Sequence, residues 1–213
     1  TEKMLLEFGQ SNYLKKALNN PKRVEQLINK IRNDGLFDTI DTVRSKLDAP
    51  IPLGYCNYGE VIDSKSNNFK VGDRVVSNGP HAEVIAVSQN LCAKVPDNVD
   101  SVNASFTVLG AISLQGIRIS NIEIGETVVV YGLGLLGIIT SKILIANGCN
   151  VVGIDNNEDK CKNAKKIGIK IINTSKNNDP TSRLNKITDN LGADKVLITV
   201  STNSNEVIKF ASQ

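Results

Sequence analysis

Three glycines in the sequence stand at a spacing that suits the binding of a diphosphate: Gly132, Gly134 and Gly137, within G-L-G-L-L-G. The first permits a tight turn, the second lets a ligand approach the backbone, and the third lets a helix lie close to a sheet. A helix that begins there offers unpaired N–H groups and the positive end of its dipole to phosphates. The amides of Leu135 and Leu136 lie in this first turn and complete the predicted diphosphate site.

The segments around these glycines predict the elements that would hold them in place. An apolar run at 127–131 predicts a strand, 135–147 has helical character, and a second apolar run at 150–154 ends in Asp155. Strand, glycine turn, helix, strand and acid form a unit that binds a dinucleotide. The carboxylate of Asp155 could accept hydrogen bonds from both hydroxyls of the adenosine ribose, and it would repel a 2′-phosphate. We therefore predict NAD(H) as the cofactor; the alternatives are a plain tight turn and an Asp155 that caps a helix or is solvated.

Side chains beyond the glycine turn join the predicted cofactor site. Asn156 and Lys160 follow the acid closely in the sequence and would lie near the ribose. Val200, Ser201 and Thr202 come at the end of the fourth predicted strand. They would flank the cofactor, because ligands of this fold bind at the carboxyl ends of the strands.

From residue 127 onward, predicted strands and helices alternate. Further strands are predicted at 169–172 and 194–200, and further helices at 157–167, 180–190 and 203–213. Continuous apolar runs indicate strands that are covered on both faces, and hence a parallel sheet. A complete dinucleotide fold has six strands in the order 3-2-1-4-5-6. Only the first four are predicted here, so we expect a fragment whose sheet edge is uncovered unless another segment or chain covers it.

The N-terminal part has a different texture. Residues 11–47 are polar and predicted to be helical. Short strand-like runs, separated by Gly and Asn, then predict a small barrel or sandwich: 59–62, 74–76 and 82–87. A linker-like turn at 97–101 precedes a predicted helix over 102–120. Residues 107–111 of this helix would line the crossover near the nicotinamide.

Composition sets limits on the function. The chain has 213 residues, of which 40% are hydrophobic, and a net charge of +3 with scattered Lys and Arg, so no nucleic-acid partner is expected. No apolar run reaches the ~18 residues that a membrane span needs, and no signal peptide is visible. The 4 cysteines form no C-x-x-C pair and are expected to be reduced thiols, which favours a cytoplasmic protein. A mechanism that needs two histidines within this chain is excluded, because it has 1.

Two further motifs complete a resemblance to a known family. Residues 71–75 read V-G-D-R-V and residues 91–97 read L-C-A-K-V-P-D, ahead of the glycine turn and Asp155. Together these motifs resemble the medium-chain dehydrogenase/reductase superfamily, whose members are similar to alcohol dehydrogenases. The resemblance implies an α/β fold that combines a GroES-like β-rich domain with a Rossmann domain, the latter a doubly wound parallel sheet.

The same resemblance implies the domain organisation. A GroES-like catalytic domain would span 1–101 with a helical insert at 11–47, and a partial Rossmann domain, truncated after strand four, would span 102–213. Residues 1–9 and 52–56 are also similar to the N-terminal half of bacterial two-part oxidoreductases that are linked to surface-polysaccharide synthesis. That likeness implies a sugar or nucleotide-sugar substrate and a second oxidoreductase domain in the full-length chain. A homodimer is a further expectation.

The sequence departs from the zinc-dependent members of the family. Residues 54–61 correspond to their G-H-E-x-x-G-x-V motif, but Tyr55 stands at the His position and Cys56 at the Glu position. A phenol is a poor zinc ligand at neutral pH, because its pKa is near ~10. The four-cysteine structural zinc lobe is absent as well. We therefore predict no metal, although a Cys upstream of Thr1 would reopen the question and Cys56 could then join it as a ligand.

Tyr55 and Thr1 are the catalytic candidates. The Tyr55 phenol could donate a hydrogen bond to a substrate carbonyl. Thr1 lies where a hydroxyl of the family relays the alcohol proton. Each could instead be a packing residue. His81 precedes a predicted strand and is interpreted as structural, with catalysis as the alternative.

These observations favour an NAD(H)-dependent oxidoreductase that acts on the alcohol or carbonyl group of a small-molecule substrate, without zinc. The nicotinamide would carry the hydride chemistry while the protein orients it. One alternative is a cofactor-binding module without turnover of its own, which partners a second catalytic half. Another is an NADP-dependent quinone or enone reductase, against which Asp155 argues.

Overall fold

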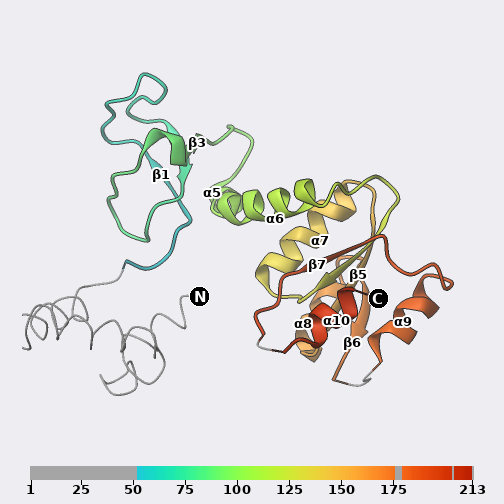
Figure 1. Cartoon of the computed structure of the whole chain (residues 1–213). Helices are drawn as coiled ribbons and strands as arrows, with labels where there is room; N and C mark the ends of the chain where they lie inside the picture. The colour runs from blue at the N-terminus through green and yellow to red at the C-terminus, as the bar shows by residue number, and fades with distance from the viewer. Residues whose placement is uncertain (1–51, 176–178, 203, 213) are drawn as a thin grey trace, which may run out of the picture. The chain divides into compact units, whose positions relative to one another are not determined.

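The computed structural model describes residues 52–175, 179–202 and 204–212. By their contacts the residues form two compact units, which divide between Lys94 and Val95 (Figure 1). The domain boundary was predicted slightly later, after Ser101, and the segment between the two positions holds the turn at 97–99. The predicted helical insert and Thr1 lie outside the described residues.

The first unit contains a small antiparallel sheet. Its strands lie in the order β1-β2-β3. Its elements are β1 (Asn57–Glu60), β2 (Arg74–Ser77), the 3-10 helix η1 (Gln89–Leu91) and β3 (Cys92–Lys94). In the central strand the side chains of Val76 and Ser77 are buried. The pairing of Asn57 with Ser77 and of Ser77 with Cys92 fixes the register of all three strands.

The strand predicted over 82–87 is wrong. Its alternating apolar residues favour a strand, but residues 81–87 have no strand pairing in the structure. A strand is stable only when its backbone groups pair with a neighbouring strand. The central strand β2 pairs with β1 on one side and with β3, a strand that was not predicted, on the other, and residues 82–87 do not pair with the outer edge of either β1 or β3.

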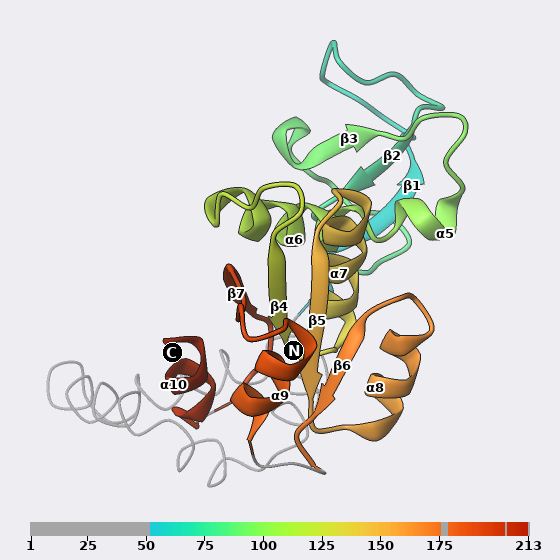
Figure 2. The same cartoon turned by 90° about the vertical axis from the view of Figure 1, so that its right-hand side faces the viewer.

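The second unit is an α/β domain. Its elements are α5 (Ser101–Ala104), α6 (Thr107–Ile119), β4 (Thr127–Tyr131), α7 (Leu135–Ala146), β5 (Asn150–Asp155), α8 (Glu158–Lys165), β6 (Lys170–Asn173), α9 (Pro180–Ile187), β7 (Lys195–Ile198) and α10 (Glu206–Ala211). The strands lie in the order β6-β5-β4-β7 and all pairs are parallel (Figure 2). This order is the 3-2-1-4 half of a dinucleotide-binding sheet, so the predicted fold class is confirmed.

Helices cover both faces of this sheet. On one face Val128 and Val130 pack in a cluster with residues of α6, α7 and α8. On the other face Val129 packs in a cluster with Leu184 of α9 and Phe210 of α10. Side chains of a strand alternate between faces, so a run of valines supplies both cores at once. The sheet is therefore doubly wound, as predicted.

The helix predicted over 102–120 is divided into α5 and α6. Asp100 caps the start of α5, where its side chain accepts a hydrogen bond from the amide of Asn103. At the break, the Ser105 hydroxyl donates to the Val102 carbonyl and the Thr107 hydroxyl donates to the Ala104 carbonyl, each at 2.7 Å. The amide of Phe106 there donates to the Asn103 carbonyl at 3.2 Å, a bond to the residue three positions back in place of the α-helical bond four positions back.

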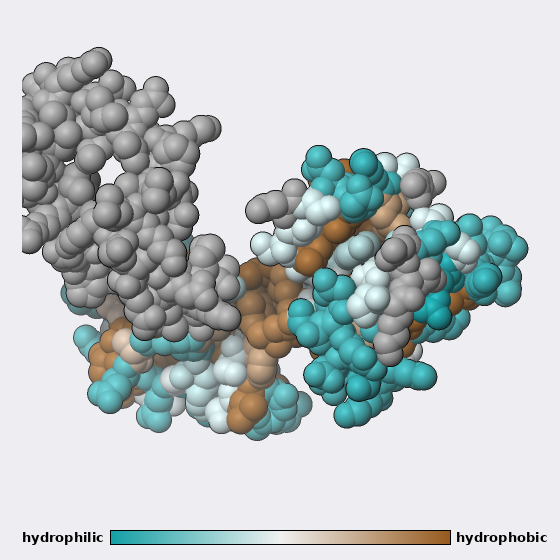
Figure 3. All heavy atoms as spheres, turned by 90° about the horizontal axis from the view of Figure 1, so that it is seen from below, coloured by the Kyte–Doolittle hydropathy of each residue, from teal (hydrophilic) through white to brown (hydrophobic). Residues whose placement is uncertain are grey.

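The surface of the described residues is mixed in character. On the face shown in Figure 3, hydrophilic residues form much of the surface and hydrophobic residues gather in smaller patches. Among the helices of the described segments, not one combines the length and the apolar character that crossing a bilayer requires.

Candidate functional site

The glycine turn begins where β4 ends. Gly132 has a φ of +107°, a conformation that residues with a side chain rarely adopt. A Cβ at this position would also lie 2.7 Å from the backbone nitrogen of Val200, which follows β7. The amide of Gly132 donates to the carbonyl of Ile154 at 2.7 Å, which joins the turn to β5. Only glycine fits at this position, between the end of β5 and the residues that follow β7.

Gly137 lets the first turn of α7 approach the chain that leaves β4. A Cβ on Gly137 would overlap the carbonyl oxygen of Gly132 and would lie 2.8 Å from the Thr199 hydroxyl. Gly137 itself is buried in the helix. The role expected of the third glycine, close packing of the helix, therefore matches its surroundings.

Gly134 differs from the other two glycines, because no other group occupies the space next to its Cα. It caps the start of α7 with an extended backbone, and a Cβ built there meets nothing within 4 Å. The start of α7 has no hydrogen bond from a side chain to its first amides. Leu135, at the first helical position, is 56% exposed, and Leu136 follows it. Free amides beside empty space are what a diphosphate group requires.

Asp155 ends β5 and contacts this turn. It is only 6% exposed, and its Oδ2 accepts a hydrogen bond of 2.8 Å from the amide of Leu133, inside the turn. Its Oδ1 accepts one of 2.8 Å from the amide of Asn157. Each carboxylate oxygen has two lone pairs, so each retains one that these two bonds do not use. The ammonium group of Lys160 lies 3.7 Å from Oδ2 and partly balances its charge.

The negative charge at this end of the sheet affects two neighbouring groups. Burial raises the pKa of the Tyr131 phenol, and the charges of Asp155 and Glu206 add to the rise. Burial likewise raises the pKa of the Cys161 thiol, and the Asp155 charge contributes to that rise as well. Both groups are therefore neutral at pH 7, and neither supplies a nucleophile to the site.

The other predicted cofactor residues lie near the ends of β5 and β7. Asn156 is exposed just after β5, and Val200, which touches the Gly132 position, is 37% exposed. Ser201 and Thr202 are also exposed, and the Thr202 hydroxyl accepts a hydrogen bond of 3.0 Å from the amide of Ser204. The structure thus gathers the predicted residues of the second unit around the carboxyl ends of the strands.

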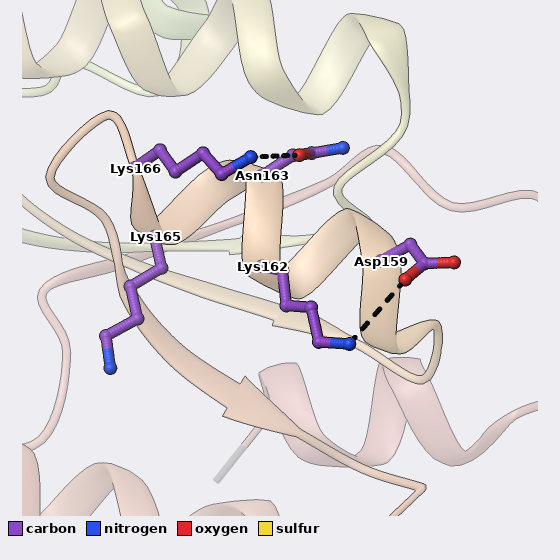
Figure 4. Close-up of a pocket in the computed structure, with 5 residues that line it drawn as sticks. All are labelled: Asp159, Lys162, Asn163, Lys165 and Lys166. Atoms are coloured by element: carbon purple, nitrogen blue, oxygen red, sulfur yellow. Dashed lines mark hydrogen bonds and ion pairs between the residues drawn. The ribbon is translucent and has the colours of Figure 1, made fainter.

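A shallow pocket lies elsewhere, on the surface of α8. Figure 4 shows the five residues that line it: Asp159, Lys162, Asn163, Lys165 and Lys166. Lys162 pairs with Asp159 at 3.8 Å, and the Lys166 ammonium donates to the Asn163 side chain at 3.3 Å. None of these residues was predicted to bind the cofactor. The pocket reflects the solvated lysine face of the helix rather than the site at the turn.

Comparison with known proteins agrees with this geometry. The family model described as "Zinc-binding dehydrogenase" matches residues 132–211, which begin at the first glycine of the turn. An alcohol dehydrogenase from Moraxella sp. (strain TAE123) is 33% identical over 110 residues, which are 51% of this chain and 32% of that protein. A solved quinone oxidoreductase from Escherichia coli, complexed with NADPH, aligns with a TM-score of 0.65 and 25% identity over 79% of this chain and 56% of that one.

The part of the chain that these matches cover belongs to the medium-chain dehydrogenase/reductase superfamily. A solved 2R,3R-butanediol dehydrogenase from Bacillus subtilis shares the fold, with a TM-score of 0.66 and 23% identity over 76% of this chain and 55% of that one. The chain spans about a third of the length of the curated relatives it matches, 32% of one and 36% of the other.

Two residues that complete the site of this dehydrogenase/reductase chain were not predicted. Thr199 donates its hydroxyl hydrogen bond to the Gly132 carbonyl at 2.6 Å. Leu133 is 2% exposed and fills the space that a side chain at Gly153 would need. Gly153 in β5 was a sequence signal that another group approaches this strand closely. No residue near Thr199 in the sequence indicated that it contacts the glycine turn.

The motif that replaces the family's zinc motif lies in the first unit. Gly54 has a φ of +76°, and a Cβ there would overlap the ring of His81. The amide of His81 donates to the Leu53 carbonyl at 2.7 Å, which agrees with the structural role predicted for it. Tyr55 is 40% exposed, and Thr1 lies outside the described residues, so the two catalytic candidates remain predictions.

The donor groups in the described part of the chain do not form a metal site. Over residues 52–175, 179–202 and 204–212, no three His, Cys, Asp or Glu side chains are grouped so that they could hold an ion. The described residues alone therefore supply no set of three donors for the family's zinc.

Proposed function

We propose that this chain binds NAD(H) at the glycine turn and that the whole protein is an oxidoreductase acting on an alcohol or carbonyl group. The observation that carries the proposal is the open side of Gly134, next to the uncapped start of α7. An atom at the Cβ position of Gly134 would meet no other group within 4 Å, which leaves room for a phosphate oxygen to approach the backbone. Family membership supports the same ligand class.

The residues of the turn have separate tasks in this proposal. The amides of Leu135, Leu136 and Gly137 bind the diphosphate, and the dipole of α7 adds a partial positive charge. Asp155 accepts hydrogen bonds from the adenosine ribose, while Asn156, Lys160, Val200, Ser201 and Thr202 border the cofactor. The nicotinamide supplies the hydride transfer when it is bound. Tyr55 donates to the substrate oxygen, and Thr1 relays a proton.

The preference for NAD(H) rests on Asp155. Its buried carboxylate stands where a 2′-phosphate would approach, and burial strengthens the repulsion between two negative charges. Lys160 offsets only part of this charge, because its own side chain is 49% exposed and 3.7 Å away. No metal takes part in this proposal. A sugar or nucleotide sugar as substrate, and a second catalytic half, rest on the likeness of the N-terminal residues alone.

A second candidate function has an observation in its favour. The quinone oxidoreductase from Escherichia coli that shares the fold is complexed with NADPH. An ammonium group close to the ribose position, as Lys160 provides, could also accept a 2′-phosphate. Under this alternative the protein reduces a quinone or enone with NADPH.

The experiment measures binding of NADH and NADPH to the full chain and to Gly134→Ala by calorimetry. We expect the substitution to lower NADH affinity about tenfold or more, because the new methyl occupies the diphosphate position. It should cost less than ~1 kcal/mol of stability, the difference between Gly and Ala at a helix N-cap. Gly116→Ala in α6, where a Cβ also meets nothing within 4 Å, is the matched control and should bind NADH normally.

The outcomes separate the candidates. Equal NADH affinity in the wild type and in Gly134→Ala would contradict the proposed site. Tighter binding of NADPH than of NADH by the wild type would favour the second candidate. If the full-length protein binds NADH but neither reduces any carbonyl substrate with NADH nor oxidises any alcohol with NAD+, it would instead be a cofactor-binding module.

A further inference from the structure

The peptide unit between Gly132 and Leu133 is held at both of its ends. Its carbonyl oxygen accepts a hydrogen bond from the Thr199 hydroxyl at 2.6 Å. Its amide donates to Oδ2 of Asp155 at 2.8 Å. The oxygen and the N–H of one trans peptide point in opposite directions, so the two partners grip a single rigid plane from opposite sides.

Thr199 is itself fixed in place by the sheet. Its amide donates to the Tyr131 carbonyl at 2.9 Å, which continues the parallel pairing of β4 and β7 beyond the last residue of β7. Its side chain is therefore carried by the backbone of a neighbouring strand and not by a free loop. The hydroxyl also lies 2.8 Å from the position of a Cβ on Gly137, so the turn, β7 and the start of α7 meet at this one group.

The orientation of this peptide plane matters for a phosphate ligand. If the plane turned over, the Gly132 carbonyl would lose its donor and the Leu133 amide would lose its acceptor. After such a turn the carbonyl would face the Asp155 carboxylate, which would repel it, and the N–H would face the Thr199 hydroxyl. The two bonds therefore hold this plane, and with it the backbone of the turn, in one orientation before a ligand arrives, and preorganisation of this kind raises affinity.

We propose that Thr199 is a positioning residue which, together with Asp155, clamps the Gly132–Leu133 peptide and so orders the glycine turn for a diphosphate. This inference rests on the proposed function, because it assumes that the turn binds a dinucleotide. Thr199 touches no ligand atom in this proposal. Its effect reaches the ligand through the backbone of the turn.

The test compares Thr199→Val and Thr199→Ser in the full chain. Valine keeps the shape of threonine and removes the hydroxyl, whereas serine keeps the hydroxyl. Calorimetry measures the affinity for ADP-ribose, which contains the diphosphate, and for adenosine, which lacks it. We expect Thr199→Val to weaken ADP-ribose roughly fivefold to tenfold, the effect of one hydrogen bond, and to change adenosine affinity less than about twofold. Thr199→Ser should restore ADP-ribose affinity.

Thr188→Val is the matched control. The Thr188 hydroxyl also donates to a backbone carbonyl, that of Leu184, at 2.9 Å. It follows α9 and precedes β7, whereas Thr199 follows β7. The hydroxyl also accepts a hydrogen bond of 3.0 Å from the Gly192 amide, so this variant should lose at least as much stability as Thr199→Val and still keep the wild-type affinity for ADP-ribose.

A second measurement does not depend on any ligand. The exchange of the Leu133 amide with solvent, followed by NMR, should accelerate in Thr199→Val and remain slow in Thr199→Ser and Thr188→Val. Unchanged exchange in Thr199→Val overturns the clamp, even if the wild type binds no ADP-ribose and the proposed function has failed. Wild-type ADP-ribose affinity in Thr199→Val, or equal losses in the valine and serine variants, overturns it as well.

Discussion

Different features stabilise the interior of each of the two units of this chain. In the second unit the strands are buried from both sides, and Val128, Val129 and Val130 have no exposed surface. In the described part of the first unit the strands are short, and conformation is imposed by glycines at positive φ, such as Gly54 and Gly72. A unit that depends on burial has a readable sequence pattern. A unit that depends on turns is specified by single positions.

The largest expected effect tests burial in the second unit. Leu144 of α7 has no exposed surface, and Leu144→Ala should lower the free energy of unfolding by about 2–5 kcal/mol. Val76→Ala in β2 of the first unit removes two methyl groups and should cost about 2 kcal/mol. Hydrogen exchange of peptides from β4 and from β2 measures the two units separately. If Leu144→Ala accelerates exchange equally in both, the units unfold together and the comparison fails.

A smaller effect is expected where the first unit depends on one backbone conformation. Gly54→Ala should cost about 1–2 kcal/mol for the positive φ, and more for its overlap with the His81 ring. In the background of His81→Ala the same substitution should cost less, because the overlap is gone. Thermal unfolding of the four proteins in this cycle measures the difference. Gly59→Ala, at a position with open space, is the control and should change little. Additive costs would show that the ring and the glycine are not coupled.

The smallest effect concerns charge in the first unit. Oδ2 of Asp73 lies 2.7 Å from the Lys94 ammonium and accepts a hydrogen bond of 2.7 Å from the Lys70 amide. The bond to Lys94 first, and then that to Lys70, lowers the pKa of this carboxyl below its usual value. A lowered folded-state pKa gives stability that is present above the unfolded pKa, near ~3.9, and is lost as the pH falls through the folded value.

The measurement for Asp73 is the unfolding of β2 against pH, in the wild type and in Asp73→Asn. The wild type should be the more stable at pH ~6, and its advantage should shrink below pH ~4. Both side chains are partly exposed, so added salt should reduce the advantage as well. A constant difference between the two proteins across this range would show that the charge of Asp73 does not contribute.

The sequence predicted the second unit well and the first unit less well, for a physical reason. Every strand from β4 to β7 was predicted close to its observed bounds, because two-sided burial demands unbroken apolar runs such as Val128 to Val130. In the first unit the run at 82–87 had the right residues for a strand but does not pair with any of the strands β1 to β3. Pairing depends on which edges other segments have already taken, and no local pattern records that.

The same contrast applies to the candidate site. The glycines and Asp155 were predictable because their spacing is local to one strand–turn–helix–strand unit. Thr199 was not, since its partner Gly132 is 67 positions away along the chain and a threonine after a strand has no distinctive pattern. Local motifs identify where a ligand binds, and long-range contacts decide how rigidly the binding backbone is held.

The bond between Thr199 and Gly132 also has a consequence for protein synthesis. A nascent chain that has left the ribosome only as far as β6 already contains the glycine motif, both flanking strands and Asp155. It still lacks the hydroxyl that secures the motif, because that group arrives with the end of β7. The affinity of the turn for a diphosphate should therefore increase only after the end of the fourth strand, β7, has emerged.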